Sequence, residues 1–295
     1  LAEIWRLGWP MGVSYFCRMA MAATDSIMVG HYAGGEHSPG EYLAASALSD
    51  MVTTLMVVPP LAFNQVLNAL CGQAVGSGNN EMAGVWLQQS VVWLGATMAP
   101  CLCGFFFVER ILRALGFSET TCALAGTYAK YNVFWPVPNG WYQCMRFYFQ
   151  AIGQPRPAMV NGVVFLFVNA ALNWIFVFGG PFRWWSATNE WRGLGFVGAA
   201  VSLSCSRCLQ PLTYFLYMFA YKKAHAGFWP EGGWRVKHHT RRRTWEFLKQ
   251  AVPLAGTLVF GAAVGQATTL LVSRLGVDAV AATTAVSTAT VMWSG

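Results

Sequence analysis

The stretch FLFVNAALNWIFVFGG, residues 165–180, decides the fold class, because it is apolar enough for a lipid bilayer and yet carries two amides. Asn169 and Asn173 are four residues apart, so on an α-helix they lie one turn apart on the same face. A helix that crosses a bilayer needs about 20 mostly apolar residues. The stretch therefore predicts a membrane-spanning helix with a polar stripe on one side.

The composition of the whole chain agrees with this interpretation. Hydrophobic residues make up 55% of the 295 residues and charged residues only 11%, against roughly 25% charged in an ordinary soluble domain. A soluble all-helical protein would need polar helix faces, and these segments lack them. We therefore predict an all-α polytopic membrane protein.

Apolar segments recur along the chain at lengths that suit membrane spans. The second of these segments, residues 43–75, contains Pro59 and Pro60. The two prolines are expected to kink or interrupt it, because each removes a backbone donor. The eighth segment is incomplete, and we expect a chain that is cut at both ends. The predicted spans are residues 4–30, 43–75, 86–108, 122–148, 157–180, 194–221, 245–273 and 279–295.

An internal repeat organises these spans into two units. EIWRLGWPMG (3–12) and EFLKQAVPLA (246–255) place Glu and Pro at the same offset, 243 residues apart. Span 7 therefore restarts what span 1 began, and six spans per unit give a parallel repeat. The expected division is a six-helix lobe at 1–221, a basic loop at 222–244, and an incomplete second lobe at 245–295.

Lysine and arginine in the connections predict the orientation, since loops on the cytoplasmic side carry more of them. Arg6, Arg156 and the loop 222–244 fall on one side, so we expect the N-terminus and that loop to be cytoplasmic. RVKHHTRRR (235–243) has no folded domain around it and abuts a span. We interpret it as an inner-leaflet contact rather than a nucleic-acid site.

Polar side chains inside spans are costly and often face a cavity. Arg18 and Asp25 in span 1 lie on one face, and span 2 carries Asn64, Gln65 and Asn68. A carboxyl group in a low-dielectric interior prefers its neutral form and ionises when water or an ion enters. Asn169 and Asn173 are predicted to form a polar wall facing Asp25, with the amides bonding the carboxyl group or supplying oxygen ligands to a cation.

Two structural alternatives stay open at this point. Amide pairs also hold transmembrane helices together without any role in transport, and an acid near the end of its span can lie at the interface. Arg207 and Lys130 are interpreted as snorkelling side chains. The eight cysteines lack nearby metal-ligand partners and are expected to be small packing residues, so no metal site and no enzyme active site are predicted.

A set of motifs in a fixed order resembles the multidrug and toxic compound extrusion (MATE) transporters from span 1 into span 8. The order and spacing of the motifs together carry the resemblance. They are ATDSIMVGHYAG (23–34), EYLAASAL (41–48), LCGQAVGSGN (70–79), AGVWLQQS (83–90), FYFQAIGQPRPAMV (147–160), VNAALNWIFVFGG (168–180) and GLGFVGAAVSLS (193–204).

The resemblance implies a twelve-span fold of two six-helix lobes that exports organic cations and other amphipathic compounds against a proton or sodium gradient. It implies that Asp25, Asn169 and Asn173 couple the ion, with no cofactor besides H⁺ or Na⁺. Arg18, Asn64, Gln65, Asn68 and Gln266 are candidate cavity residues. The expected partners are the bilayer and small amphipathic or cationic substrates, and we expect a monomer.

The sequence departs from the family pattern in the second lobe. Many members carry a glutamate in span 7 where this chain has Gly261, and the nearest polar side chain is Gln266. Thr283 and Thr284 replace a usual His-Gln step. Two alternatives therefore stand beside the transporter: a lipid-linked flippase of related architecture, for which Arg18 and Arg207 are the hints, and a non-transporting fragment.

Overall fold

The computed structural model describes residues 2–181, 193–230, 233–234 and 239–273, with a few single positions beyond. Every regular element in these ranges is a helix, so the predicted all-α fold class is confirmed. The elements are α1 (Ala2–Gly30), α2 (Pro39–Gly76), α3 (Asn80–Phe105), α4 (Val108–Ala114), α5 (Glu119–Asn132), α6 (Pro136–Ala151), α7 (Arg156–Phe178), α9 (Phe196–Phe215), the π-helical η1 (Leu216–Tyr221), the 3₁₀ turn η2 (Ala226–Phe228) and α10 (Arg241–Ser273).

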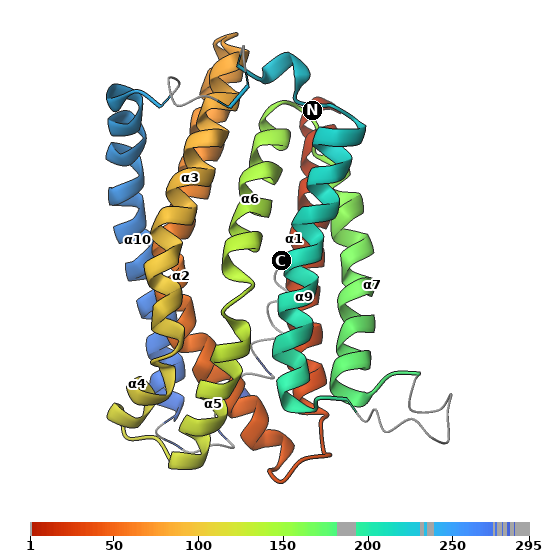
Figure 1. Cartoon of the computed structure of the whole chain (residues 1–295), viewed down its shortest axis with the longest axis vertical. Helices are drawn as coiled ribbons and strands as arrows, with labels where there is room; N and C mark the ends of the chain where they lie inside the picture. Colours follow the sequence, from red (N-terminus) through yellow and green to blue (C-terminus); the bar gives the residue numbers. More distant parts are fainter. Residues whose placement is uncertain are drawn as a thin grey trace.

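The long helices run side by side along one axis of the molecule (Figure 1). α1 packs against α7, and α7 packs against α9. α2 packs against α3 on one side and α10 on the other, and α6 contacts α2, α3 and α9. The N-terminus and the connection from η1 to α10 lie at the same end of the bundle (Figure 1).

Side-chain chemistry sets several helix ends. Ser38 caps α2 through a reciprocal pair of bonds, because its hydroxyl accepts from the Glu41 backbone and its backbone N–H donates to the Glu41 carboxylate. Such a capping box satisfies two donors that the first turn leaves unpaired. α7 ends where Gly179 adopts a left-handed conformation with φ of 88°, which glycine reaches without a Cβ clash.

The structure corrects the predicted spans in three places. Span 122–148 is two helices, because Pro136 and Pro138 remove backbone donors that a continuous helix needs. Span 86–108 runs as α3 and is followed by α4 at an angle of 57°. α2 is one helix through Pro59 and Pro60, so of the predicted kink or interruption the interruption is wrong. The predicted eighth span lies outside the described residues apart from single positions.

Three described helices, α2, α7 and α10, are long and apolar enough to cross a membrane, and α3 with α4 makes a fourth if the bent pair is one span. α1 is long enough, but Arg18 and Asp25 lower its hydropathy. α10 begins at Arg241, so the three arginines 241–243 form its first turn and do not belong to the predicted loop 222–244. The predicted division into lobes stays a prediction.

α1 and α10, the helices that begin the two predicted repeats, each contain an equivalent side-chain hydrogen bond to the helix proline. The Ser14 hydroxyl donates to the carbonyl of Pro10 at 2.7 Å in α1. The Thr257 hydroxyl donates to the carbonyl of Pro253 at 3.2 Å in α10. Each pair is four residues apart, and each bond lies beside the helix proline, where hydroxyl back-bonding often accompanies a bend.

Candidate functional site

The candidate site centres on Asp25, whose side chain is buried near the C-terminal end of α1. The side-chain amides of Asn169 and Asn173, both on α7, donate to the same Asp25 oxygen. The Nδ2 group of Asn173 donates to Asp25 Oδ1 at 2.8 Å, and that of Asn169 donates to the same oxygen at 3.0 Å. Asp25 is 7% exposed and the two asparagines are fully buried. The predicted contact between Asp25 and the amide pair is present.

The amides are themselves held in place. Asn173 Nδ2 also bonds the backbone carbonyl of Asn169 at 3.1 Å, and Asn169 Nδ2 lies 3.3 Å from the hydroxyl of Ser206 on α9. Three helices therefore meet at the carboxylate. Among the described residues, the second Asp25 oxygen accepts no hydrogen bond and Asn173 Oδ1 has no partner. A proton or a small cation would find acceptor oxygens there.

Glycines let these three helices approach closely enough to form the site. A side chain at Gly198 of α9 would clash with the backbone carbonyl of Phe176 in α7. Gly162 of α7 lies against Ser14 and Cys17 of α1. Close approach of backbones at small residues is the usual means of packing transmembrane helices. It brings Ser206 within reach of Asn169.

The sequence-based interpretation of Arg207 as a snorkelling side chain was wrong. Arg207 of α9 is 8% exposed and lies near Asp25 without a direct ion pair, so it does not snorkel to the surface. Its neighbours are Arg18 of α1 and Tyr142 of α6. Arg146 of α6, which sequence analysis did not consider, is equally buried. It lies two residues before the end of the predicted span 122–148, so the signal that could have found it is a charge within a mostly apolar stretch.

The other predicted cavity residues do not join Asp25. Asn64 is buried and accepts a hydrogen bond from the Cys144 thiol at 2.8 Å, which ties α2 to α6. Gln65 and Asn68 are exposed on α2, and Gln266 is half-buried on α10. Asn64 therefore takes part in helix packing, and the cavity roles predicted for all four residues stay predictions.

The described residues hold no group of three or more His, Cys, Asp or Glu side chains that could bind a metal ion. All eight cysteines are free. Four of them are not the buried packing residues that the sequence suggested, because Cys101, Cys205 and Cys208 are half-buried and Cys103 is exposed. Cys208 lines an apolar cavity, and the exposed Cys103 is a small apolar thiol that tolerates contact with lipid.

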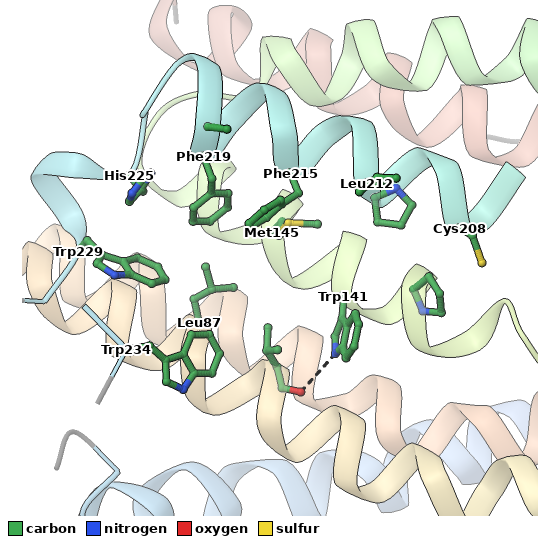
Figure 2. Close-up of a pocket in the computed structure, with 14 residues that line it drawn as sticks. Leu87, Trp141, Met145, Cys208, Leu212, Phe215, Phe219, His225, Trp229 and Trp234 are labelled. Atoms are coloured by element: carbon green, nitrogen blue, oxygen red, sulfur yellow. Dashed lines mark hydrogen bonds between the residues drawn. The ribbon is translucent and has the colours of Figure 1, made fainter. Parts of the chain in front are cut away.

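An apolar cavity of about 860 Å³ lies between α3, α6, α9, η1 and the connection that follows (Figure 2). Its wall carries aromatic rings from four segments, namely Trp141, Phe215, Phe219, Trp229 and Trp234. The indole N–H of Trp141 donates to the carbonyl of Val91 at 3.4 Å. A cavity of this lining would take the apolar or aromatic part of a small molecule.

The sequence comparisons identify the family. A model of the MatE family matches residues 10–175, more than half of the chain. The chain belongs to the MatE family. Protein DETOXIFICATION 32 of Arabidopsis thaliana is 27% identical over 73% of this chain and 39% of its own length. A probable multidrug resistance protein NorM of Bacillus cereus is 24% identical over 94% of this chain and 58% of its own length.

Solved structures of MatE-family transporters share the fold of this chain. The eukaryotic MATE transporter AtDTX14 superimposes with a TM-score of 0.76 at 21% identity, over 92% of this chain and 56% of that protein. A MATE transporter solved in complex with MaD3S gives a TM-score of 0.74 at 18% identity. MatE transporters are multi-pass integral membrane proteins, and this chain spans between 39% and 58% of the length of DETOXIFICATION 32, AtDTX14 and the Bacillus cereus NorM protein.

Proposed function

We propose that this MatE-family chain forms the ion-coupling lobe of a secondary transporter, which exports amphipathic organic compounds in exchange for protons or sodium ions. The observation that carries the proposal is the convergence of Asn169 and Asn173 on one oxygen of buried Asp25. A carboxyl group held by donors on one oxygen can gain or lose a proton on the other. The chain's similarity to probable multidrug resistance proteins supports export.

The coupling step follows from where Asp25 lies. α1 packs against α7. Pro10 lies in the N-terminal part of α1 and, because proline has no backbone N–H, it interrupts the hydrogen bonds of that helix. When Asp25 takes up a proton, its attraction to the two amide donors weakens, because charge-assisted hydrogen bonds are about twice as strong as neutral ones. α1 can then shift against α7, which would change the access of the interior to each side of the membrane.

The orientation is part of the proposal. Arg6, Arg156 and Lys222 line a common polar pocket at the end of the bundle that holds the N-terminus. Lys222 donates to the side-chain oxygen of Gln154 at 2.9 Å. Because cationic residues concentrate on the cytoplasmic side of membrane proteins, this end would face the cytoplasm.

A transport assay with imposed ion gradients tests the proposal. The protein is reconstituted in proteoliposomes, and export of a fluorescent amphipath is followed under a pH gradient, a sodium gradient and neither. We expect gradient-driven export that Asp25→Asn abolishes, while substrate binding persists. Glu81→Gln, at an exposed acid in the first turn of α3, is the matched control. Gradient-driven export that survives Asp25→Asn would remove Asp25 from the mechanism.

A lipid-linked flippase is the second candidate, since buried arginines would suit a phosphate-bearing substrate. It predicts lipid translocation that does not depend on Asp25, so the same Asp25→Asn variant separates the two functions.

A further inference from the structure

Three arginines from three different helices meet inside the bundle. Arg18 comes from α1, Arg146 from α6 and Arg207 from α9, and Arg18 lies close enough to the other two for electrostatic interaction. The Tyr142 side chain of α6 interacts with all three. Arg146 and Arg207 are each only 8% exposed. Residues so far apart in sequence form one cationic cluster, in which Arg146 and Arg207 are buried and Arg18 is half-buried.

The cluster lacks compensating negative charge. In the described part of the chain, none of the three arginines forms a salt bridge, and the nearby acid is Asp25, whose amide partners already hold one oxygen. Asp50 interacts with Asp25, but its side chain is exposed. A buried cation without a partner is costly, and inside a membrane protein it marks an ion or substrate path.

Aromatic rings satisfy the guanidinium groups only in part. Arg18 lies over the ring of Tyr15 at 5.4 Å, and Arg146 lies over the ring of Phe147 at 4.9 Å. The Nε groups of both arginines are buried without a hydrogen-bond partner among the described residues. A guanidinium group presents its N–H donors in one plane, as a fork. This arrangement matches the oxygens of a carboxylate, sulfonate or phosphate.

Two neutral polar side chains lie near Arg146, one beside it on α6 and one on α9. Gln143 lies one turn before Arg146 on α6, and both atoms of its buried amide are unpaired within the described residues. The hydroxyl of buried Tyr214 is also unpaired there, and its ring meets that of Tyr142 edge-on, with centroids 5.4 Å apart. Buried polar groups are normally satisfied. Several unpaired donors beside three cations offer hydrogen bonds that an anionic group could accept.

We propose that Arg18, Arg146 and Arg207 bind the anionic group, a carboxylate, sulfonate or phosphate, of an amphipathic substrate. This inference rests on the proposed transport function and names its substrate class. It reverses the charge that the family resemblance suggests, because a cation would be repelled from this lobe. The apolar cavity occupies the adjoining faces of α6 and α9, where Met145 and Cys208 neighbour Arg146 and Arg207 in sequence. That cavity would take the apolar body.

The test compares two ligands that share an aromatic body and differ in charge. The chain in phosphatidylcholine nanodiscs is titrated with pyrenebutyrate and with pyrenebutyltrimethylammonium, and energy transfer from tryptophan to pyrene reports binding. We expect the anion to bind about tenfold more tightly, as one charge-assisted hydrogen bond requires. Equal affinities on the unaltered chain, a comparison that needs no variant, would overturn the proposal.

Variants assign the effect to the cluster. Arg146→Gln and Arg207→Gln are each expected to weaken the anion by about tenfold and to leave the cation unchanged or tighter. Arg146→Lys, which keeps the charge but lacks the planar fork, should weaken the anion less than Arg146→Gln does. Arg110→Gln is the matched control, since Arg110 is exposed and stacks on Phe107 at 5.6 Å. Equal loss of both ligands in Arg146→Gln would contradict the site.

Discs that also contain phosphatidylglycerol identify the source of the anionic group. If phosphatidylglycerol displaces pyrenebutyrate, and Arg146→Gln removes this competition, the site binds a lipid headgroup. If pyrenebutyrate stays bound in these discs, the site binds a soluble organic anion. Binding is measured without an ion gradient. A failure of anion selectivity is therefore distinct from a failure of Asp25-dependent transport.

Discussion

The amide nitrogen of Asn173 lies 2.8 Å from Oδ1 of Asp25, across the contact between α7 and α1. The amide of Asn169 reaches the same oxygen at 3.0 Å from one turn earlier. Two donors on one oxygen orient the carboxylate and leave the other oxygen for exchange. The amides therefore join the two helices and also set the geometry of the acid.

Asn169→Ala and Asn173→Ala should both lower thermal stability in detergent, because each removes a donor to a buried carboxylate, worth about 1–3 kcal/mol. Each should also weaken gradient-driven export by more than the loss of folded protein explains. Asn161→Ala on the same helix, which removes a bond to Thr213 at 3.2 Å, is the control. Parallel loss of stability and transport in all three variants would indicate that the pair only packs helices.

The Asn64–Cys144 bond should contribute to stability and not to ligand binding. Cys144→Ala leaves the buried amide oxygen of Asn64 unpaired, so we expect a loss of about 1 kcal/mol in the free energy of unfolding. Cys144→Ser keeps a donor and should lose less. Denaturant titration in micelles measures the difference. Pyrenebutyrate binding that changes with Cys144→Ala at constant folded fraction would place Asn64 in the ligand site.

Gly198 and Gly72 should respond oppositely to alanine. A methyl group at Gly198 meets the carbonyl of Phe176, so Gly198→Ala must push α9 away from α7 and lower the melting temperature. Gly72 in α2 has open space around it. Gly72→Ala should raise stability by about 0.5–1 kcal/mol, since alanine favours a helix interior. A tolerated Gly198→Ala would show that the α7–α9 contact is not tight.

His225 should make the connection after η1 sensitive to pH. Burial lowers the pKa of His225, and nearby Lys223 lowers it further. The ring stacks on Phe219 at 4.8 Å and meets Trp229 edge-on at 5.4 Å.

Because the unfolded chain titrates near pH 6.5, it binds more protons below that value than the folded chain does, and stability falls as the pH is lowered. The melting temperature of the unaltered chain should drop below about pH 6.5, and His225→Phe should reduce the drop. His31→Phe, at an exposed position, is the control. An unchanged pH profile in His225→Phe would exclude this histidine.

Local chemistry was sufficient for several features. Hydropathy and helical periodicity belong to single segments, so the sequence predicted the membrane class and the shared face of Asn169 and Asn173. Their approach to Asp25 was predicted on a different ground, because polar side chains inside spans usually face the bundle interior. The sequence also showed the repeat of Glu and Pro between α1 and α10. The equivalent hydrogen bonds from Ser14 and Thr257 to the proline carbonyls agree with this repeat.

Other features depend on which helix faces meet, and no single segment contains that information. Asn64 and Asn68 lie one turn apart on α2, yet packing buries the first and exposes the second. Arg18, Arg146 and Arg207 resemble isolated charges in three separate spans until α1, α6 and α9 converge. Their meeting leaves buried positive charge without a partner, and only the tertiary structure decided that, because electrostatic interaction depends on distance through space.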